Sequence, residues 1–323
     1  MTLSRRHFLT AGASLPLAGL LGGATAHAKA PLAGVQATGI HRTLVGQAEV
    51  TALLDGYVDV ATQLLSRFDS DEVSTALSGN GYKTLDKGLR IPVNGYLINT
   101  GDRLVLLDTG AASMFGPTLG TLAANLDAAG VAPADIDLVV LTHLHVDHVG
   151  GLLDGAGQAM FPNAELVVSQ TEWDFWHDDA MMAAAGEGAA AFFQAARSTT
   201  APYADRLKLF DGETDLGAGL TTMPLPGHTP GHTGYLLSSG DDALLFWGDV
   251  IHITGLQFTH PDITIAFDTD PAVTKETRAR MLDMAAADGL SVTGAHLEFP
   301  GFGHVMRAGD AYRFQHAPWR HTL

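Results

Sequence analysis

Histidine and aspartate crowd one short segment of the chain, which reads THLHVDH over residues 142–148. His143 and His145 are two residues apart, so their imidazoles point to one side of an extended loop. Asp147 and His148 can turn toward a second point nearby. Imidazole and carboxylate groups are the usual protein ligands of divalent metal ions in cysteine-free sites. The spacing therefore predicts a site that serves two adjacent metals.

Three further polar positions follow short apolar stretches and could complete such a site. His228 lies in the turn PGHTPGH over residues 226–232, where glycine and proline can hold an imidazole rigidly. Asp249 follows one apolar stretch, where its carboxylate could be shared by two metals. His296 follows the next apolar stretch. A single Asp or His at a strand end is more often a cap, but several such pieces in order favour a metal centre.

The composition excludes several other kinds of chemistry. The chain has 323 residues and no cysteine, which removes disulfides, thiol nucleophiles, iron–sulfur clusters and zinc sites built on thiolates. The formal net charge is −17, from 18 basic and 35 acidic residues. Such a charge repels phosphate backbones and anionic lipid headgroups. We therefore expect no nucleic-acid partner, and chemistry that relies on His, carboxylates and hydroxyls.

The first 28 residues resemble a twin-arginine export signal. Arg5 and Arg6 precede a weakly apolar stretch that ends in AHA at residues 26–28, a pattern typical of signal cleavage. A disordered basic tail and a short membrane anchor are the alternatives. We expect cleavage, a hydrolase domain over residues 29–323, and a periplasmic or secreted protein. No other segment has the 18 or more apolar residues of a membrane span, so no stable span is expected after cleavage.

The elements that must position these residues alternate between strands and helices. Strand patterns are found over residues 42–60, 91–99, 103–107, 136–141, 220–225, 235–237, 243–247 and 291–293, the last being the final strand expected. Helical spacing is found over residues 118–129, over 171–197 in two pieces, and over 271–287 after an initial proline. This order predicts one α/β layered domain with two halves.

The motifs, taken in order, resemble those of the metallo-β-lactamase superfamily. They are Asp108-Thr109-Gly110, the segment 143–148, His228, Asp249 and His296. The resemblance implies a four-layer αββα sandwich with a binuclear metal site at one edge. It implies a first metal on His143, His145 and His228, a second on Asp147, His148 and His296, and Asp249 as the bridge. By the same resemblance Asp108 would orient a ligand, and His232 would not be one.

Within the superfamily, the sequence is most similar to methyl parathion hydrolase and its relatives that hydrolyse lactones and aryl esters. The similarity lies in residues 110–120 and 295–304 and in the Phe-Trp and Phe-Phe pairs at 175–176 and 192–193. It implies an exported homodimer with an aromatic pocket over the metals. The pocket positions implied are Phe115, Trp176, Phe193 and Phe267, with His252 where signal-lactone lactonases usually carry Tyr. β-Lactam hydrolysis is disfavoured, because those enzymes carry Cys or Ser at the Asp249 position.

The expected activity is hydrolysis of neutral aryl esters and lactones by a water that two divalent ions activate, with Asp147 and Asp249 as the catalytic carboxylates. Zn²⁺ is the expected metal, and Mn²⁺, Co²⁺ or Fe²⁺ would fit the same ligands. Organophosphate triesters stay open as side substrates or as the main substrates. The alternative functions are a thioesterase of the glyoxalase II type, an iron-dependent dioxygenase and a metal-binding protein without activity.

Overall fold

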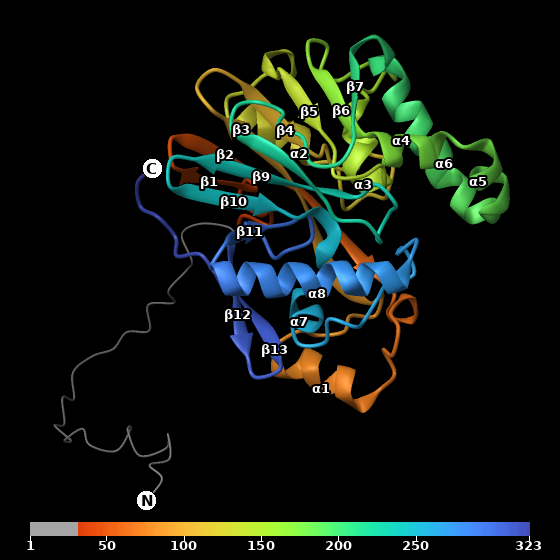
Figure 1. Cartoon of the computed structure of the whole chain (residues 1–323), viewed down its shortest axis with the longest axis vertical. Helices are drawn as coiled ribbons and strands as arrows, with labels where there is room; N and C mark the ends of the chain where they lie inside the picture. Colours follow the sequence, from red (N-terminus) through yellow and green to blue (C-terminus); the bar gives the residue numbers. More distant parts are fainter. Residues whose placement is uncertain (1–31) are drawn as a thin grey trace, which may run out of the picture. The chain divides into compact units, whose positions relative to one another are not determined.

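Two β-sheets lie face to face in the computed structural model, which describes residues 32–323 (Figure 1). Within those residues the first sheet has seven strands in the order β1-β2-β3-β4-β5-β6-β7, and the second has six in the order β13-β12-β11-β10-β9-β8. The strands are β1 (Ile40–Val45), β2 (Ala48–Val60), β3 (Leu89–Asn99), β4 (Leu104–Leu107), β5 (Leu138–Val140), β6 (Glu165–Ser169), β7 (Leu207–Phe210), β8 (Leu220–Pro224), β9 (Thr233–Ser239), β10 (Asp242–Phe246), β11 (Ser291–Thr293), β12 (Gly303–Ala308) and β13 (Ala311–His316).

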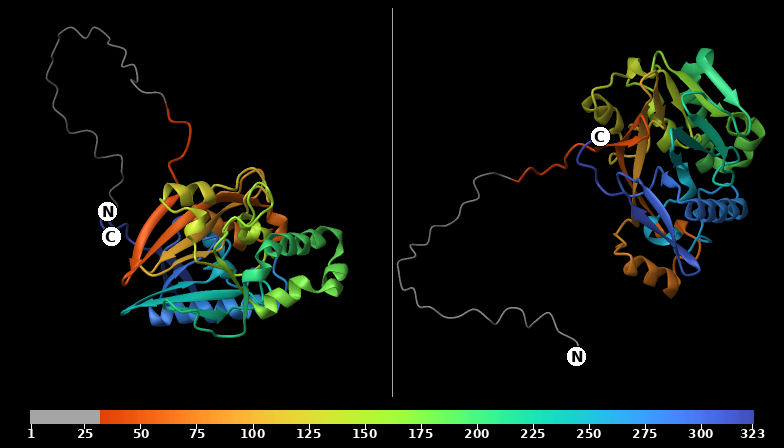
Figure 2. Two further views of the ribbon diagram at one scale, coloured as in Figure 1. Left: turned by 90° about the horizontal axis from the view of Figure 1, so that it is seen from above. Right: turned by 60° about the vertical axis from the view of Figure 1, so that its left-hand side comes forward.

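The described residues form eight α-helices, most of which pack against the outer faces of the two sheets. They are α1 (Asp71–Gly79), α2 (Leu122–Ala128), α3 (Val146–Val149), α4 (Gln170–His177), α5 (Asp179–Ala184), α6 (Gly186–Thr200), α7 (Thr254–Gln257) and α8 (Pro271–Asp288). Residues of α2, α3, α4 and α6 share a buried cluster with the first sheet, and α8 shares another with the second. Figure 2 shows the stacked sheets, with α8 on the outer side of the second.

Side-chain alternation along the strands separates the cores. On β10, Leu244 and Phe246 face the first sheet, whereas Leu245 packs toward α8. On β5, Val140 faces the second sheet and Val139 faces the helices. Because consecutive side chains of a strand point to opposite faces, each sheet is apolar on both sides and must be covered on both. The predicted helix–sheet–sheet–helix fold is thereby confirmed.

Two local predictions agree closely with the structure. The strands predicted over 91–99 and 103–107 are present as β3 and β4, which pair as a hairpin with Asn99 opposite Leu104. Helix α8 begins at Pro271, as predicted, because the Asp270 carboxylate accepts the backbone N–H groups of Ala272 and Val273. It ends before Gly289, whose φ of 63° suits glycine in the left-handed region.

Three local predictions are wrong in extent. Helix α2 begins at Leu122 rather than at residue 118, because the Asp55 carboxylate accepts the N–H groups of Gly120 and Leu122 and holds the preceding residues in a loop. The segment 171–197 forms three helices, since the Asp178 carboxylate starts a new one by accepting two N–H groups. The strand 291–293 is not the last. β12 and β13 follow it as a half-exposed edge hairpin with a weak apolar signal.

The fold gathers several loops at one edge. β10 and β11 run parallel, so the loops that follow them leave the same end of the second sheet. The loop after β5 reaches the start of β9, where the N–H of Thr233 donates to the carbonyl of Thr142 at 2.9 Å. These elements belong to the compact unit 38–323.

The predicted signal segment 1–28 lies outside the described residues, and within residues 32–323 no helix has the length and apolar character of a membrane span.

Candidate metal centre

The histidine-rich segment leaves the carboxyl end of β5 and turns into α3. Asp108, at the end of β4, holds the start of this loop. Its carboxylate accepts the backbone N–H and the hydroxyl of Thr142, both at 2.9 Å. His143 and His145 lie in the extended part, whereas Asp147 and His148 lie in the helical turn. The change from extended to helical backbone sends the two pairs of side chains in different directions, as the spacing predicts.

Glycine lets two other ligand-bearing loops pack closely against neighbouring residues. Gly227 has a φ of 130°, and a Cβ there would lie 2.4 Å from the backbone nitrogen of Thr274, so the turn before His228 requires glycine. Gly248 has a φ of 55° and precedes Asp249. A Cβ there would lie 2.5 Å from Nε2 of His232, so this position also requires glycine. The local sequence thus sets the backbone that carries two of the predicted ligands.

Three histidines form the first group of donor atoms. Nδ1 of His145 lies 2.9 Å from Nε2 of His143 and 3.0 Å from Nε2 of His228. Oδ2 of Asp249 lies 3.3 Å from Nε2 of His228 and 3.7 Å from Nε2 of His143. The three nitrogens all lie within 4.8 Å of one another, which is close enough to hold one ion.

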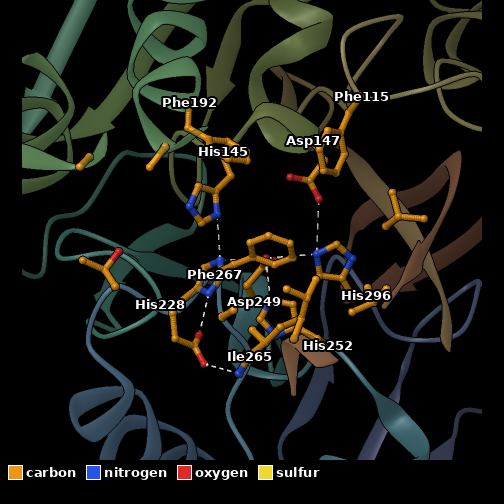
Figure 3. Close-up of a pocket in the computed structure, with 18 of the residues that line it drawn as sticks. Phe115, His145, Asp147, Phe192, His228, Asp249, His252, Ile265, Phe267 and His296 are labelled. Atoms are coloured by element: carbon orange, nitrogen blue, oxygen red, sulfur yellow. Dashed lines mark hydrogen bonds and ion pairs between the residues drawn. The ribbon is translucent and has the colours of Figure 1, made fainter. Parts of the chain in front are cut away.

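A second group of donors lies beside the first (Figure 3). Oδ2 of Asp147 lies 3.6 Å from Nε2 of His296 and 3.7 Å from Nε2 of His148. Asp249 reaches this group as well, with Oδ1 3.4 Å from His148 and Oδ2 3.1 Å from His296. The structure therefore brings all seven predicted ligands together, with Asp249 between the two groups.

In three of these histidines, the ring nitrogen that faces away from the donor cluster contacts another group. Nδ1 of His148 lies 2.8 Å from Oδ2 of Asp108, and Nδ1 of His228 lies 2.9 Å from Oδ1 of Asp268. Nδ1 of His296 donates to the carbonyl of Pro92 at 2.8 Å. Such contacts fix the ring so that the other nitrogen can face a metal. Asp268 is missed by the sequence patterns, because it lies 40 residues from His228 in no recognisable motif.

Two buried atoms in the centre test whether metals fit. Nε2 of His148 and Oδ1 of Asp249 are buried and have no hydrogen-bond partner among the described residues. Buried polar atoms in proteins almost always have a partner. Both atoms face the space between the ligand groups, and five imidazoles with two carboxylates are a donor set suited to two divalent ions. The residues present therefore fit the implied metals.

Burial and charge move the pKa values of the centre in opposite directions. Burial lowers the pKa of His143 and His145 well below the usual range. Burial opposes the charged form of Asp249, but the imidazoles around it, His296 first, hold its pKa well below the usual range. Burial also disfavours protonated His228, yet its contacts with Asp249 and Asp268 raise the pKa to about 9. Cations bound here would displace such protons, so metal binding is coupled to pH.

A cavity of about 680 Å³ opens over the ligands. All five predicted pocket residues line it: Phe115, Trp176, Phe193, His252 and Phe267. One wall comes from α4, α5 and α6 and includes Met181, Ala184 and Ala189, with Ala185 between α5 and α6. The opposite wall comes from β2, the turn that follows it and the loop before α8, and includes Val58, Leu64 and Ile265. The cavity is therefore mostly apolar, with the candidate metal centre at its base.

The aromatic residues differ in how far they face this cavity. Trp176 and Phe193 are each 4% exposed and pack mainly in the core beside the first sheet. Trp176 also meets His145 edge-on, with ring centroids 5.4 Å apart. Phe192, to which the resemblance assigns no pocket role, is only partly buried, and its ring lies 6.0 Å from the His145 ring. Both members of the pair line the cavity, and helical spacing alone could not tell which one is the more exposed.

Two further histidines differ in their contacts. Nε2 of His252 lies 3.3 Å from Oδ2 of Asp249, and the ring stacks on that of His296 at 5.1 Å. His252 thus lines the cavity and reaches the ligand cluster at the same time. His232 turns away from the cavity. Its Nε2 accepts the N–H of Asp249 at 3.0 Å, and its Nδ1 donates to the carbonyl of Leu225 at 2.9 Å. These bonds use both nitrogens, so His232 supports the Asp249 loop.

Comparison with known proteins gives the same fold and similar sequences. The family model of the metallo-beta-lactamase superfamily matches residues 88–295. The crystal structure of AbOPH, a hydrolase in the beta lactamase superfamily, is 33% identical, covers 88% of this chain and 100% of its own, and has a TM-score of 0.84. AidC, a dizinc quorum-quenching lactonase, is 27% identical, with 88% and 99% covered and a TM-score of 0.81.

A curated N-acyl homoserine lactonase of Bacillus thuringiensis is 26% identical over an alignment of 182 residues, with 50% of this chain and 64% of the lactonase covered. The chain spans between 40% and 64% of the length of the first curated relatives that it matches. The family model itself covers well over half of the chain, and it includes all seven candidate ligands except His296, which follows its last residue. The chain therefore belongs to the metallo-beta-lactamase superfamily.

Proposed function

We propose that this protein hydrolyses neutral lactones and aryl esters with two divalent metal ions, Zn²⁺ first among them. The observation that carries the proposal is the position of Asp249 between two groups of ligands at the base of an apolar cavity. Three positions on the cavity wall are alanines in α5, in α6 and between these two helices, which leave room for an apolar substituent. The lactonases among the similar proteins support the lactone class.

The charge of the cavity favours uncharged substrates. No lysine or arginine is found among the described residues that line it. Apart from the imidazoles of the candidate metal centre, its ionisable side chains are acidic and include Asp59 and Asp268. An anionic substrate would meet these carboxylates without a cationic group of the protein to bind it, whereas an uncharged ester needs none. This argues against thioesters of glutathione, whose carboxylates need a basic surface.

The residues around the cluster divide the work of ester hydrolysis. When bound, divalent ions supply an activated water and polarise the substrate's carbonyl oxygen. Asp249 and Asp147 would neutralise part of the charge of bound ions. The carboxylate of Asp147, 13% exposed, faces the cavity and would be placed to take up a proton there. Phe115, Phe192 and Phe267 surround the space for the leaving group and exclude water from it. No separate protein nucleophile is required.

The test measures the hydrolysis of two substrates by the wild type, by a ligand variant and by a control variant. Zinc-loaded protein is assayed with dihydrocoumarin and methyl paraoxon, beside Asp249→Asn and the control Asp241→Asn, in which an exposed carboxylate is changed. We expect the lactone to be hydrolysed far faster than the phosphotriester. Asp249→Asn should lose at least 1,000-fold in kcat/KM, about 4 kcal/mol of transition-state stabilisation, while Asp241→Asn stays at the wild-type rate.

Other outcomes would identify the alternative activities. Faster turnover of methyl paraoxon would make phosphotriesters the main substrates. Hydrolysis of a thioester but of neither substrate would support the glyoxalase II type of activity. Two bound ions without turnover of any ester would contradict hydrolysis and direct attention to redox chemistry or to metal binding alone. Elemental analysis of the protein purified from its native compartment distinguishes zinc from manganese, cobalt and iron.

We also propose export and dimerisation, both of which rest on sequence resemblance. Arg5 and Arg6 would direct export to the periplasm or the medium, followed by cleavage near residue 28. Replacing both arginines by lysine should leave the uncleaved protein inside the cell, and N-terminal sequencing of the exported form identifies the cleavage site. Light scattering of the mature protein tests for the homodimer, and a mass near that of one chain would contradict it.

A further inference from the structure

A buried carboxylate outside the ligand set lies beneath the first group of donors. Glu172, in α4, has no solvent exposure. Its Oε1 accepts the N–H of Leu144 at 3.0 Å and the indole N–H of Trp176 at 2.6 Å. Its Oε2 accepts the hydroxyl of Thr229 at 2.7 Å and the N–H of Gly231 at 3.0 Å. All four donors point at one carboxylate that is buried away from bulk solvent.

These donors belong to the segments that carry the first ligand group. Leu144 lies between His143 and His145, and Thr229 follows His228. A Cβ at Gly231 would lie 2.2 Å from the backbone nitrogen of Glu172, so glycine is needed for the turn to reach α4. Oε1 therefore holds one ligand loop, and Oε2 holds the other.

The second ligand group has different supports. His148 is held by Asp108, and His296 by the carbonyl of Pro92. Neither contact involves Glu172. Loss of the Glu172 carboxylate should therefore act on one metal position and spare the other, whereas a general loss of stability would weaken both.

We propose that Glu172 is a positioning residue for the first metal, which sets the spacing of His143, His145 and His228 by joining their two loops to α4. Burying a carboxylate is unfavourable unless hydrogen bonds satisfy it, and four donors do so here. The inference rests on the two-metal centre of the proposed function. It goes beyond that function by assigning one side chain to one of the two metal positions.

Glutamine at position 172 has nearly the same size but cannot make the same bonds. Its amide has one acceptor oxygen, and its NH₂ group would face an N–H donor whichever way it is turned. Turned one way it opposes the N–H of Leu144, and turned the other way it opposes the N–H of Gly231. One of the two loops must then separate from α4.

The experiment measures metal retention rather than turnover. Full-length wild type, Glu172→Gln, Thr229→Val and Glu165→Gln are loaded with Zn²⁺ and titrated with a chelator, and bound zinc is counted. Glu165 is a matched control, because its carboxylate pairs with Lys208 at the surface. We expect two ions in wild type and control, and one ion in Glu172→Gln to be released at 10- to 100-fold lower chelator concentration. Thr229→Val should weaken the same ion by less.

The outcomes separate this inference from the proposed function. Circular dichroism of the metal-free forms checks folding, and Thr229→Val, which keeps the carboxylate, tests the inference if Glu172→Gln does not fold. Equal release of both ions in Glu172→Gln and Thr229→Val, or release at the wild-type chelator concentration, would overturn the inference. A wild type that holds two ions but hydrolyses no ester would overturn the proposed function and leave the role of Glu172 intact. A wild type that binds no divalent ion would overturn both.

Discussion

Single carboxylates outside the ligand set orient the imidazoles of the centre. Asp108 and Asp268 each approach a histidine Nδ1 within 2.9 Å. Asp268 also accepts the N–H of Ile265 through its other oxygen, at 2.9 Å, so the same side chain shapes the loop that carries Phe267. Hydrogen bonding and charge from His228 hold the pKa of Asp268 at about 2 although burial would raise it. At this scale, ligand geometry depends on residues that touch no metal.

We predict that Asp268→Asn weakens zinc binding by roughly 10- to 100-fold. An asparagine oxygen can still accept from His228, but the NH₂ group then opposes the N–H of Ile265, and the negative charge that favours metal binding is lost. The measurement is competition for zinc with a chromophoric chelator. Asp262→Asn serves as the control, because Asp262 is exposed and pairs with Arg67. Unchanged zinc affinity in Asp268→Asn would contradict the assigned role.

At the level of elements, cross-strand pairs fix the register of the antiparallel strands β2 and β3, whose end borders the cavity. Asp59 lies opposite Arg90 in the register of these strands, and the two side chains form an ion pair at 2.8 Å. The guanidinium of Arg90 also lies 3.6 Å from the centre of the Tyr57 ring. The hydrogen bond from Arg90 is the main reason that the pKa of Asp59 is lowered.

We predict that Asp59→Asn lowers the free energy of unfolding by up to about 1 kcal/mol at pH 7, since the pair is partly exposed to solvent. A lowered carboxyl pKa stabilises the folded state above the unfolded pKa of about 4, and the contribution is lost as the pH falls through the folded value. The difference between variant and wild type should therefore shrink at pH 3. Urea unfolding at the two pH values measures it, and a constant difference would contradict the ion pair as its source.

At the level of the whole molecule, the candidate metal centre joins both sheets. Its ligands follow β5 of the first sheet and β10 and β11 of the second, and His228 lies between β8 and β9. Ions bound there would contact loops from both halves of the fold. Metal binding should for that reason contribute to global stability as well as to catalysis.

We predict that removing the metals lowers the Tm of the wild type. Free zinc at 1,000 times Kd stabilises a folded protein by about 4 kcal/mol per site, which corresponds to roughly 8 °C in a domain of this size. Scanning calorimetry before and after chelation measures the shift. Asp249→Asn, which lacks the shared ligand, should show a much smaller shift. An equal Tm with and without metal in the wild type would contradict this role.

The sequence by itself determined the local features of the protein. The spacing of His143, His145 and His148 selects ligands, because side-chain direction in a loop or a short helix depends on neighbouring residues. The alternation in β10 and the Asp-Pro start of α8 likewise need only adjacent positions. His228, Asp249 and His296 were indicated by their positions after apolar stretches, and the resemblance assigned the ligands to two metals. The structure places the whole set in one cluster. Features of this kind are encoded over a few residues.

Only the tertiary structure decided which distant residues support the centre. Glu172 reaches Thr229 across 57 residues and Asp268 reaches His228 across 40, and no short-range pattern marks either contact. The edge hairpin of β12 and β13 was missed for a related reason, since half-exposed strands carry little apolar periodicity. The position of His252 against Asp249 also depends on how the loop after β10 folds. Hydrogen bonds between distant segments form only when the core brings those segments together, so no pattern of neighbouring residues predicts them.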